Sequence, residues 1–178
     1  MSRPAVFVDE SKAKDYLLVA AAIVSGDPTA CRKATRALLL PGQPRLHMKK
    51  ESDARRKQIL DTFESLETTI SIYRAPKHLG SEVRRRDLCL EQLVLDLGRT
   101  GAHLCLERDD SLVSRDRQRL IETTREAGSK ETLDYWHETA ASEPLLAIPD
   151  AVGWAWARGG HWRRHANRLI SSIIEIPQ

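Results

Sequence analysis

The stretch "PAVFVDESKAKDYLLVAAAIV" (4–24) contains two apolar runs on either side of a short polar segment. The first run, Val6 to Val8, leads into Asp9 and Glu10, and the second covers 16–24. Because the connection is short, this pattern predicts an antiparallel β-hairpin. The first strand would then end in two adjacent carboxylates, and carboxylates are rarely buried unless something pairs with them.

Beyond the hairpin, helical and extended patterns alternate along the chain. Helices are predicted over 27–42, 52–66, 81–101, 114–128 and 143–160, and strands over 68–75, 102–107 and 132–139. The segment 45–48 is predicted as a short strand or sheet edge, and the tail from 169 to pack back on the body. Hairpin strands followed by alternating helices and strands predict an α/β fold, with a central mixed sheet flanked by helices.

The length of 178 residues predicts a single domain over 1–178, and 41% hydrophobic residues suffice for a core. No run approaches the roughly 20 apolar residues of a membrane helix, and the N-terminus lacks a signal-peptide pattern. The three cysteines are far apart, which indicates buried free thiols rather than disulfides or a zinc site. We therefore expect a cytoplasmic protein with no membrane contact.

Arginine is clustered although the net charge is only +3. The clusters are "RRK" (55–57), "RRR" (84–86) and "HWRRH" (161–165). Any one of them can be a solvated helix face, but together they suit a phosphate-bearing partner such as nucleic acid. Trp162 can stack on a base or simply close a surface corner, which is the commoner role. The candidate nucleic-acid contacts are Arg84, Arg85, Arg86, Trp162, Arg163 and Arg164.

Acidic residues recur where strands are expected to end. Asp9 and Glu10 follow the first strand, Glu107 ends the strand at 102–107, and Asp109 follows in "ERDD". Asp150 lies in the otherwise apolar "LLAIPDAVGWAW". Each group has a structural alternative. Asp9 and Glu10 can form a turn, "ERDD" can be a solvated loop, and Asp150 can cap a helix. Ligand sites in α/β sheets gather at the carboxyl ends of strands, where these acids would meet.

Carboxylates that meet in one place repel each other unless a cation lies between them. Oxygen ligands without a Cys or His set point to Mg²⁺ or Mn²⁺. Strand alternation puts Glu107 and Asp109 on one face if the strand continues. Glu10 would point away from Asp9 in an ideal strand, although a strand end can let both reach one ion.

Three segments carry a family resemblance: "FVDES" (7–11), "RLHMKKESDARRKQIL" (45–60) and "LLAIPDAVGWAWAR" (145–158). Through these segments the chain resembles the ribonuclease H-like fold and, more narrowly, the DUF3800 family of microbial proteins. Lys12 stands where that family usually has Gly. The resemblance implies Asp9 as the metal-bridging carboxylate, Glu107 or Asp109 as the acid of a second strand, and Asp150 as the acid of the last helix.

What the resemblance implies is a nuclease dependent on Mg²⁺ or Mn²⁺, with RNA or an RNA-containing duplex as the favoured substrate. His47 matches a recurrent histidine of the family. It either acts near the site on a phosphate or a proton, or packs between strand and helix, which we favour. The alternatives are a non-catalytic binding module on the same fold and a transposase- or resolvase-like DNA nuclease. A homodimer through an edge strand or the helix at 81–98 stays open.

Overall fold

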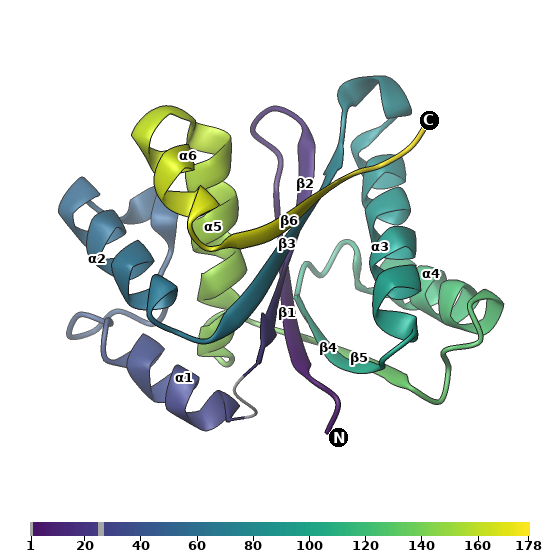
Figure 1. Ribbon diagram of the computed structural model, residues 1–178, viewed down its shortest axis with the longest axis horizontal. Helices are drawn as coiled ribbons and strands as arrows, with labels where there is room; N and C mark the ends of the chain where they lie inside the picture. Colours follow the sequence, from purple (N-terminus) through teal and green to yellow (C-terminus); the bar gives the residue numbers. More distant parts are fainter. Residues whose placement is uncertain (1, 25–26) are drawn as a thin grey trace.

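The computed structural model describes residues 2–24 and 27–178. One mixed sheet has the strand order β5-β4-β1-β2-β3-β6 (Figure 1). The pairs β1–β2 and β2–β3 are antiparallel, while β1–β4, β4–β5 and β3–β6 are parallel. This confirms the α/β, ribonuclease H-like class with a hairpin followed by parallel strands. The strands are β1 (Ala5–Ser11), β2 (Tyr16–Ile23), β3 (Thr68–Ala75), β4 (Ala102–Glu107), β5 (Leu133–Glu138) and β6 (Ile170–Glu175).

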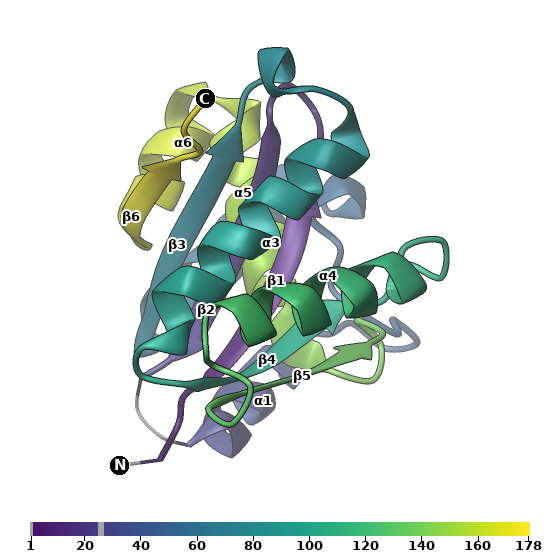
Figure 2. The same ribbon diagram turned by 90° about the vertical axis from the view of Figure 1, so that its right-hand side faces the viewer.

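Helices cover both faces of the sheet, as Figures 1 and 2 show. The helices packed on one face are α1 (Pro28–Arg36), α2 (Asp53–Glu64), α5 (Ala147–Arg158) and α6 (Gly160–Asn167). The other face is covered by α3 (Glu82–Gly98) and α4 (Val113–Glu126). Short 3₁₀ helices are η1 (Met48–Lys50), η2 (Lys77–Leu79) and η3 (Pro144–Leu146).

Strand alternation divides the core into two layers. Phe7 of β1 and Cys105 of β4 are buried in the layer under α5, whereas Val6 and Val8 are buried under α3. Each further step along β1 therefore changes the face. Asp9 follows Phe7 onto the α5 side, and Glu10 follows Val8 onto the α3 side.

Several boundaries differ from the sequence prediction. The segment 45–48 is not in the sheet, because its chain turns into η1 at Met48. The first helix ends at Arg36, before the predicted stop. The tail does pack back, and it does so as β6, an edge strand parallel to β3. Gly159, with φ of +82°, ends α5 as expected, but a further helix, α6, begins directly after it.

Helix α5 begins earlier than a capping role for Asp150 would require. Its first residue is Ala147, so Pro149 lies in the first turn, where the missing N–H breaks no intrahelical bond. Asp150 is inside that turn and does not cap the helix. None of the helices in the described part of the chain is both long and apolar enough to span a membrane.

Candidate functional site

Three carboxylates from distant parts of the chain come together on the α5 side of the sheet. Asp9 lies near the end of β1, Glu107 is the last residue of the adjacent parallel strand β4, and Asp150 lies in the first turn of α5. Glu107 and Asp150 both act electrostatically on Asp9, and Glu107 also acts on Asp150. We call Asp9, Glu107 and Asp150 the carboxylate site.

Asp9 is the most deeply buried member, with 8% of its surface exposed. Its Oδ1 accepts a hydrogen bond of 2.7 Å from the backbone N–H of Glu10. Burial, followed by a hydrogen bond with the carboxyl group of Glu107 and repulsion from Glu107 and Asp150, raises the pKa of Asp9 well above its usual value. The site therefore contains more negative charge than its protein surroundings neutralise.

Asp150 is held from outside its own helix. Its Oδ2 accepts a hydrogen bond of 3.0 Å from the backbone N–H of Met48, at the start of η1. Burial raises the pKa of Asp150, and this bond and the nearby His47 and Arg45 only partly oppose the rise. The segment 45–48 thus forms a wall of the carboxylate site, although it is not the strand that the sequence suggested.

Glu10 is not part of the carboxylate site, which corrects its inclusion among the catalytic candidates. Its carboxylate accepts hydrogen bonds from Arg86 of α3 and from the Tyr16 hydroxyl, and it pairs with Lys12. These partners lie on the α3 side of the sheet. Strand alternation continues to the end of β1 and separates Glu10 from Asp9.

Asp109 also lies outside the carboxylate site. Strand β4 ends at Glu107, so the alternation that would have placed Asp109 beside it does not continue. The Asp109 carboxylate instead accepts hydrogen bonds from the hydroxyl and backbone N–H of Ser111, at 2.6 and 3.0 Å, and these lower its pKa. It belongs to the turn before α4, and Glu107 is the acid that β4 contributes.

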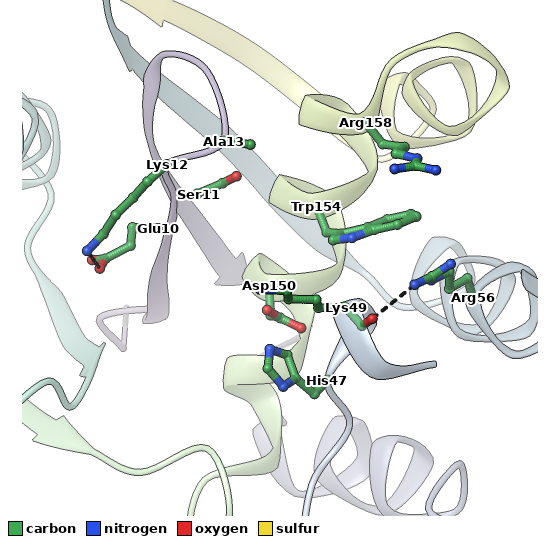
Figure 3. Close-up of a pocket in the computed structure, with 10 residues that line it drawn as sticks. All are labelled: Glu10, Ser11, Lys12, Ala13, His47, Lys49, Arg56, Asp150, Trp154 and Arg158. Carbon is green, nitrogen blue, oxygen red and sulfur yellow. Dashed lines mark hydrogen bonds and ion pairs between the residues drawn. The ribbon is translucent and has the colours of Figure 1, made fainter. Parts of the chain in front are cut away.

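A pocket of about 490 Å³ opens beside Asp150 (Figure 3). Asp150 and His47 lie near its centre, and the β1–β2 hairpin forms one wall while Trp154, Arg56 and Arg158 form the opposite one. The lining residues are Glu10, Ser11, Lys12, Ala13, His47, Lys49, Arg56, Asp150, Trp154 and Arg158. The half-buried His47 therefore lines this pocket, and both its role near the site and the packing role that we favoured stay predictions.

The pocket carries cations that can bind an anionic ligand. Arg56 stacks on Trp154 at 4.2 Å, and its guanidinium donates to Met48 O and to Asp53. Within the described ranges, neither Lys49 nor Arg158 has an ion-pair partner, although Arg158 lies 5.9 Å from the Trp154 ring centre. Lys49 and Arg158 are thus available to bind phosphate.

Sequence reasoning did not single out Lys49, Trp154 or Arg158. Asp150, Trp154 and Arg158 are spaced four residues apart, which places them on one face of a helix. That spacing was a usable signal once Asp150 had been selected. The contribution of Lys49 depends on the path of the loop before α2, which no local pattern reveals.

The predicted nucleic-acid contacts fall mostly outside this pocket. Arg86 is 3% exposed and binds Asp116 through two hydrogen bonds of 2.8 Å, and Trp162 is 8% exposed and packs edge-on against Trp154, so neither can reach a nucleic acid. Arg163 donates to Trp156 O, and Arg85 to Ala75 O. Arg84 and Arg164 are exposed but do not line the pocket.

A second acidic group lies between α2 and α6. Asp61, Glu64 and His165 form the one group in the described chain whose ligand atoms all lie within 4.8 Å of one another. Lys57 pairs with Asp61 at 2.7 Å and Arg168 pairs with Glu64 at 3.0 Å, so protein cations already neutralise both carboxylates. The carboxylate site is less exposed than this group, and within the described residues its three acids form a single ion pair, between Glu107 and Arg45.

Asp9, Glu107 and Asp150 contribute carboxylate oxygens to the carboxylate site, with His47 beside Asp150 and Arg45 on Glu107. This donor set fits a hard divalent cation such as Mg²⁺ or Mn²⁺. Comparison of the chain with protein-family models, curated proteins and solved structures gives no match. The resemblance to the DUF3800 family therefore stays a prediction, and the residues themselves carry the functional argument.

Proposed function

We propose that this protein is a nuclease that hydrolyses phosphodiester bonds of nucleic acid with the help of Mg²⁺ or Mn²⁺. The observation that carries the proposal is the convergence of Asp9, Glu107 and Asp150 next to a pocket with unpaired cations. An acidic centre beside basic side chains suits a ligand that is itself a chain of phosphates bound to metal ions. Glu10 and Asp61 have protein counter-ions, whereas within the described residues neither Asp9 nor Asp150 forms an ion pair.

In this proposal Asp9, Glu107 and Asp150 would hold the metal. Bound Mg²⁺ or Mn²⁺ supplies the charge that lowers the pKa of an attacking water and stabilises the leaving oxygen. The protein's own contribution is positioning. The Met48 N–H fixes the Asp150 carboxylate, and Lys49 and Arg158 bind the phosphate backbone without reading bases. His47, which lines the pocket beside Asp150, would exchange a proton with the leaving group, a role that histidine commonly performs.

RNA or an RNA/DNA hybrid is the first substrate to test, on the basis of the ribonuclease H-like fold alone. A cytoplasmic location and a homodimer remain predictions that accompany this proposal. No described contact distinguishes RNA from DNA, so the substrate panel must include both.

The test is a cleavage assay on labelled single-stranded RNA, single-stranded DNA, both duplexes and a hybrid, with Mg²⁺, Mn²⁺ or EDTA. We expect metal-dependent cleavage by the wild type and a loss of at least about 100-fold in Asp9→Asn and Asp150→Asn, since a loss of about 2.7 kcal/mol of transition-state stabilisation costs about 100-fold. Asp110→Asn is the matched control, because Asp110 is exposed and pairs only with Arg108. Equal cleavage by all four proteins would refute the assignment, and binding without cleavage in any metal would favour a binding module.

A further inference from the structure

Arg45 is the one arginine that touches the carboxylate site in the described part of the chain. Its Nη1 donates to Glu107 Oε1 at 3.0 Å, and its charge also acts on Asp150. The loop that carries it is anchored by the buried Leu46 and Met48 on its C-terminal side. Arg45 is therefore the protein's own counter-charge for the place where a metal ion would be bound.

The contact between Arg45 and Glu107 is weak enough to be exchanged for another partner. The pair has a single hydrogen bond, its side chains are 28% and 22% exposed, and the second contact of Arg45, from Nε to Leu46 O, is long at 3.4 Å. Arg86 differs, because it is buried and donates two hydrogen bonds to Asp116. Arginine pairs with this degree of exposure contribute little to stability.

The side chain of Arg45 also has room to move. It lines a cavity of about 80 Å³ together with Leu39, Pro44 and Ala140. A guanidinium and a divalent cation on the same carboxylate repel each other. Binding of an ion at Glu107 would therefore drive Arg45 off this carboxylate, and a phosphate oxygen is the partner that guanidinium geometry fits best.

We propose that Arg45 is an exchangeable counter-cation of the carboxylate site. It neutralises Glu107 in the absence of a divalent ion, and it turns to a phosphate of the bound nucleic acid when the ion is present. This inference rests on the proposed function, and it assigns Arg45 a positioning role that couples metal binding to substrate binding. An arginine that stayed on Glu107 would also repel the ion, but it would not strengthen oligonucleotide binding in the presence of metal.

The experiment measures Mn²⁺ binding without substrate, by the loss of the free-Mn²⁺ signal in electron paramagnetic resonance. We expect Arg45→Gln to bind Mn²⁺ about five-fold more tightly than the wild type, the equivalent of about 1 kcal/mol for a partly exposed pair. Arg45→Lys keeps the charge and should stay within about two-fold of the wild type. Arg36→Gln is the matched control, since Arg36 is exposed beside the same cavity and touches none of the three acids.

A second measurement tests the other half of the exchange. In Mn²⁺, Arg45→Gln should bind a labelled oligonucleotide more weakly than the wild type, while Arg36→Gln should not. Mn²⁺ affinity that is unchanged or weaker in Arg45→Gln overturns the inference and leaves the proposed function intact. A wild type that binds no Mn²⁺ refutes the proposed function itself, and the inference falls with it.

Discussion

Replacing Asp9 by Asn should stabilise the metal-free protein at neutral pH. Asp9 is buried beside two other carboxylates, and its one hydrogen-bond donor from the backbone is Glu10 N–H. An Asn side chain can keep that bond through its Oδ1 and can donate its amide N–H to Glu107. The substitution therefore removes a charge from a repulsive cluster without leaving a polar atom unpaired.

The pH dependence of this effect follows from the raised pKa of Asp9. The folded protein holds the Asp9 proton more tightly than the unfolded chain, so the stability of the wild type falls as the pH rises from about 3.8, the ordinary value, through the raised pKa. Below that window Asp9 is protonated in both states and the charge imposes no penalty. The advantage of Asp9→Asn should thus be absent near pH 3.5 and largest at neutral pH.

The expected size comes from the cost of a buried polar group without adequate partners, about 1–3 kcal/mol. For a chain of this length, 1 kcal/mol shifts the melting temperature by roughly 2–4 °C. Asp9→Asn should therefore melt roughly 2–12 °C above the wild type in EDTA at pH 7.5. Metal reverses the order: Mn²⁺ at about 100 times its Kd adds about 2.7 kcal/mol to the wild type and much less to the variant.

The assay is thermal and urea unfolding from pH 3.5 to 8, in EDTA and in Mn²⁺. Asp116→Asn is the control with the opposite sign, because Asp116 is more deeply buried than Asp9 but binds Arg86 and His137, which lower its pKa despite that burial. Its stabilising contribution is present at neutral pH and lost as the pH falls below about 3.8. Losing it should cost about 3–5 kcal/mol. An Asp9→Asn protein that is less stable than the wild type in EDTA at pH 7.5 would refute the reasoning.

Three further outcomes are expected. Lys49→Gln and Arg158→Gln should each weaken oligonucleotide binding and reduce the salt dependence by slightly less than one unit per phosphate contact, measured by fluorescence anisotropy at several salt concentrations, with the remote Lys130→Gln unchanged. Gly153→Val should destabilise the protein by about 1–3 kcal/mol in urea unfolding and also impair cleavage, because even a Cβ at Gly153 would lie 3.2 Å from Val19 Cγ2 where α5 meets β2. Arg86→Met should reduce the stability by about 3–5 kcal/mol, because it leaves the buried Asp116 and the partly buried Glu10 without their arginine partner. The Mn²⁺ affinity should change little, because Arg86 lies on the opposite side of the sheet from the carboxylate site.

The carboxylate site could be predicted from sequence because its signals are local. Asp9 and Glu107 follow apolar strand patterns, and Asp150 interrupts an apolar helix, so each is conspicuous where it stands. The rule that strand ends meet at one edge then brought the two strand acids together. The choice between Glu107 and Asp109 needed the exact end of β4, and boundaries of elements are the weakest part of any pattern.

Other features depend on partners that are remote in sequence. Arg86 has the appearance of a surface arginine in "RRR", and only Asp116 from α4 and Glu10 from β1 make its burial tolerable. Strand β6 was missed because Ser171 and Ser172 interrupt its apolar pattern, and pairing with β3 supplies what the sequence lacks. Trp154 and Trp162 pack against each other across α5 and α6, a contact that requires the turn at Gly159.

The adjacent residues Asp9 and Glu10 illustrate how the sheet separates stability from chemistry. Alternation along β1 sends Glu10 to a face where Arg86, Asp116 and His137 complete a buried network, so its charge is neutralised. The same alternation sends Asp9 to a face where its nearest charged neighbour is another acid. The network on the α3 side holds the end of β1 in place. It can offset the cost of crowding carboxylates on the α5 side, which is about a few kcal/mol. A strand end held only by its front face would be expected to relax and let the acids separate, so the neutral side of the sheet stabilises the arrangement of acids on the other side.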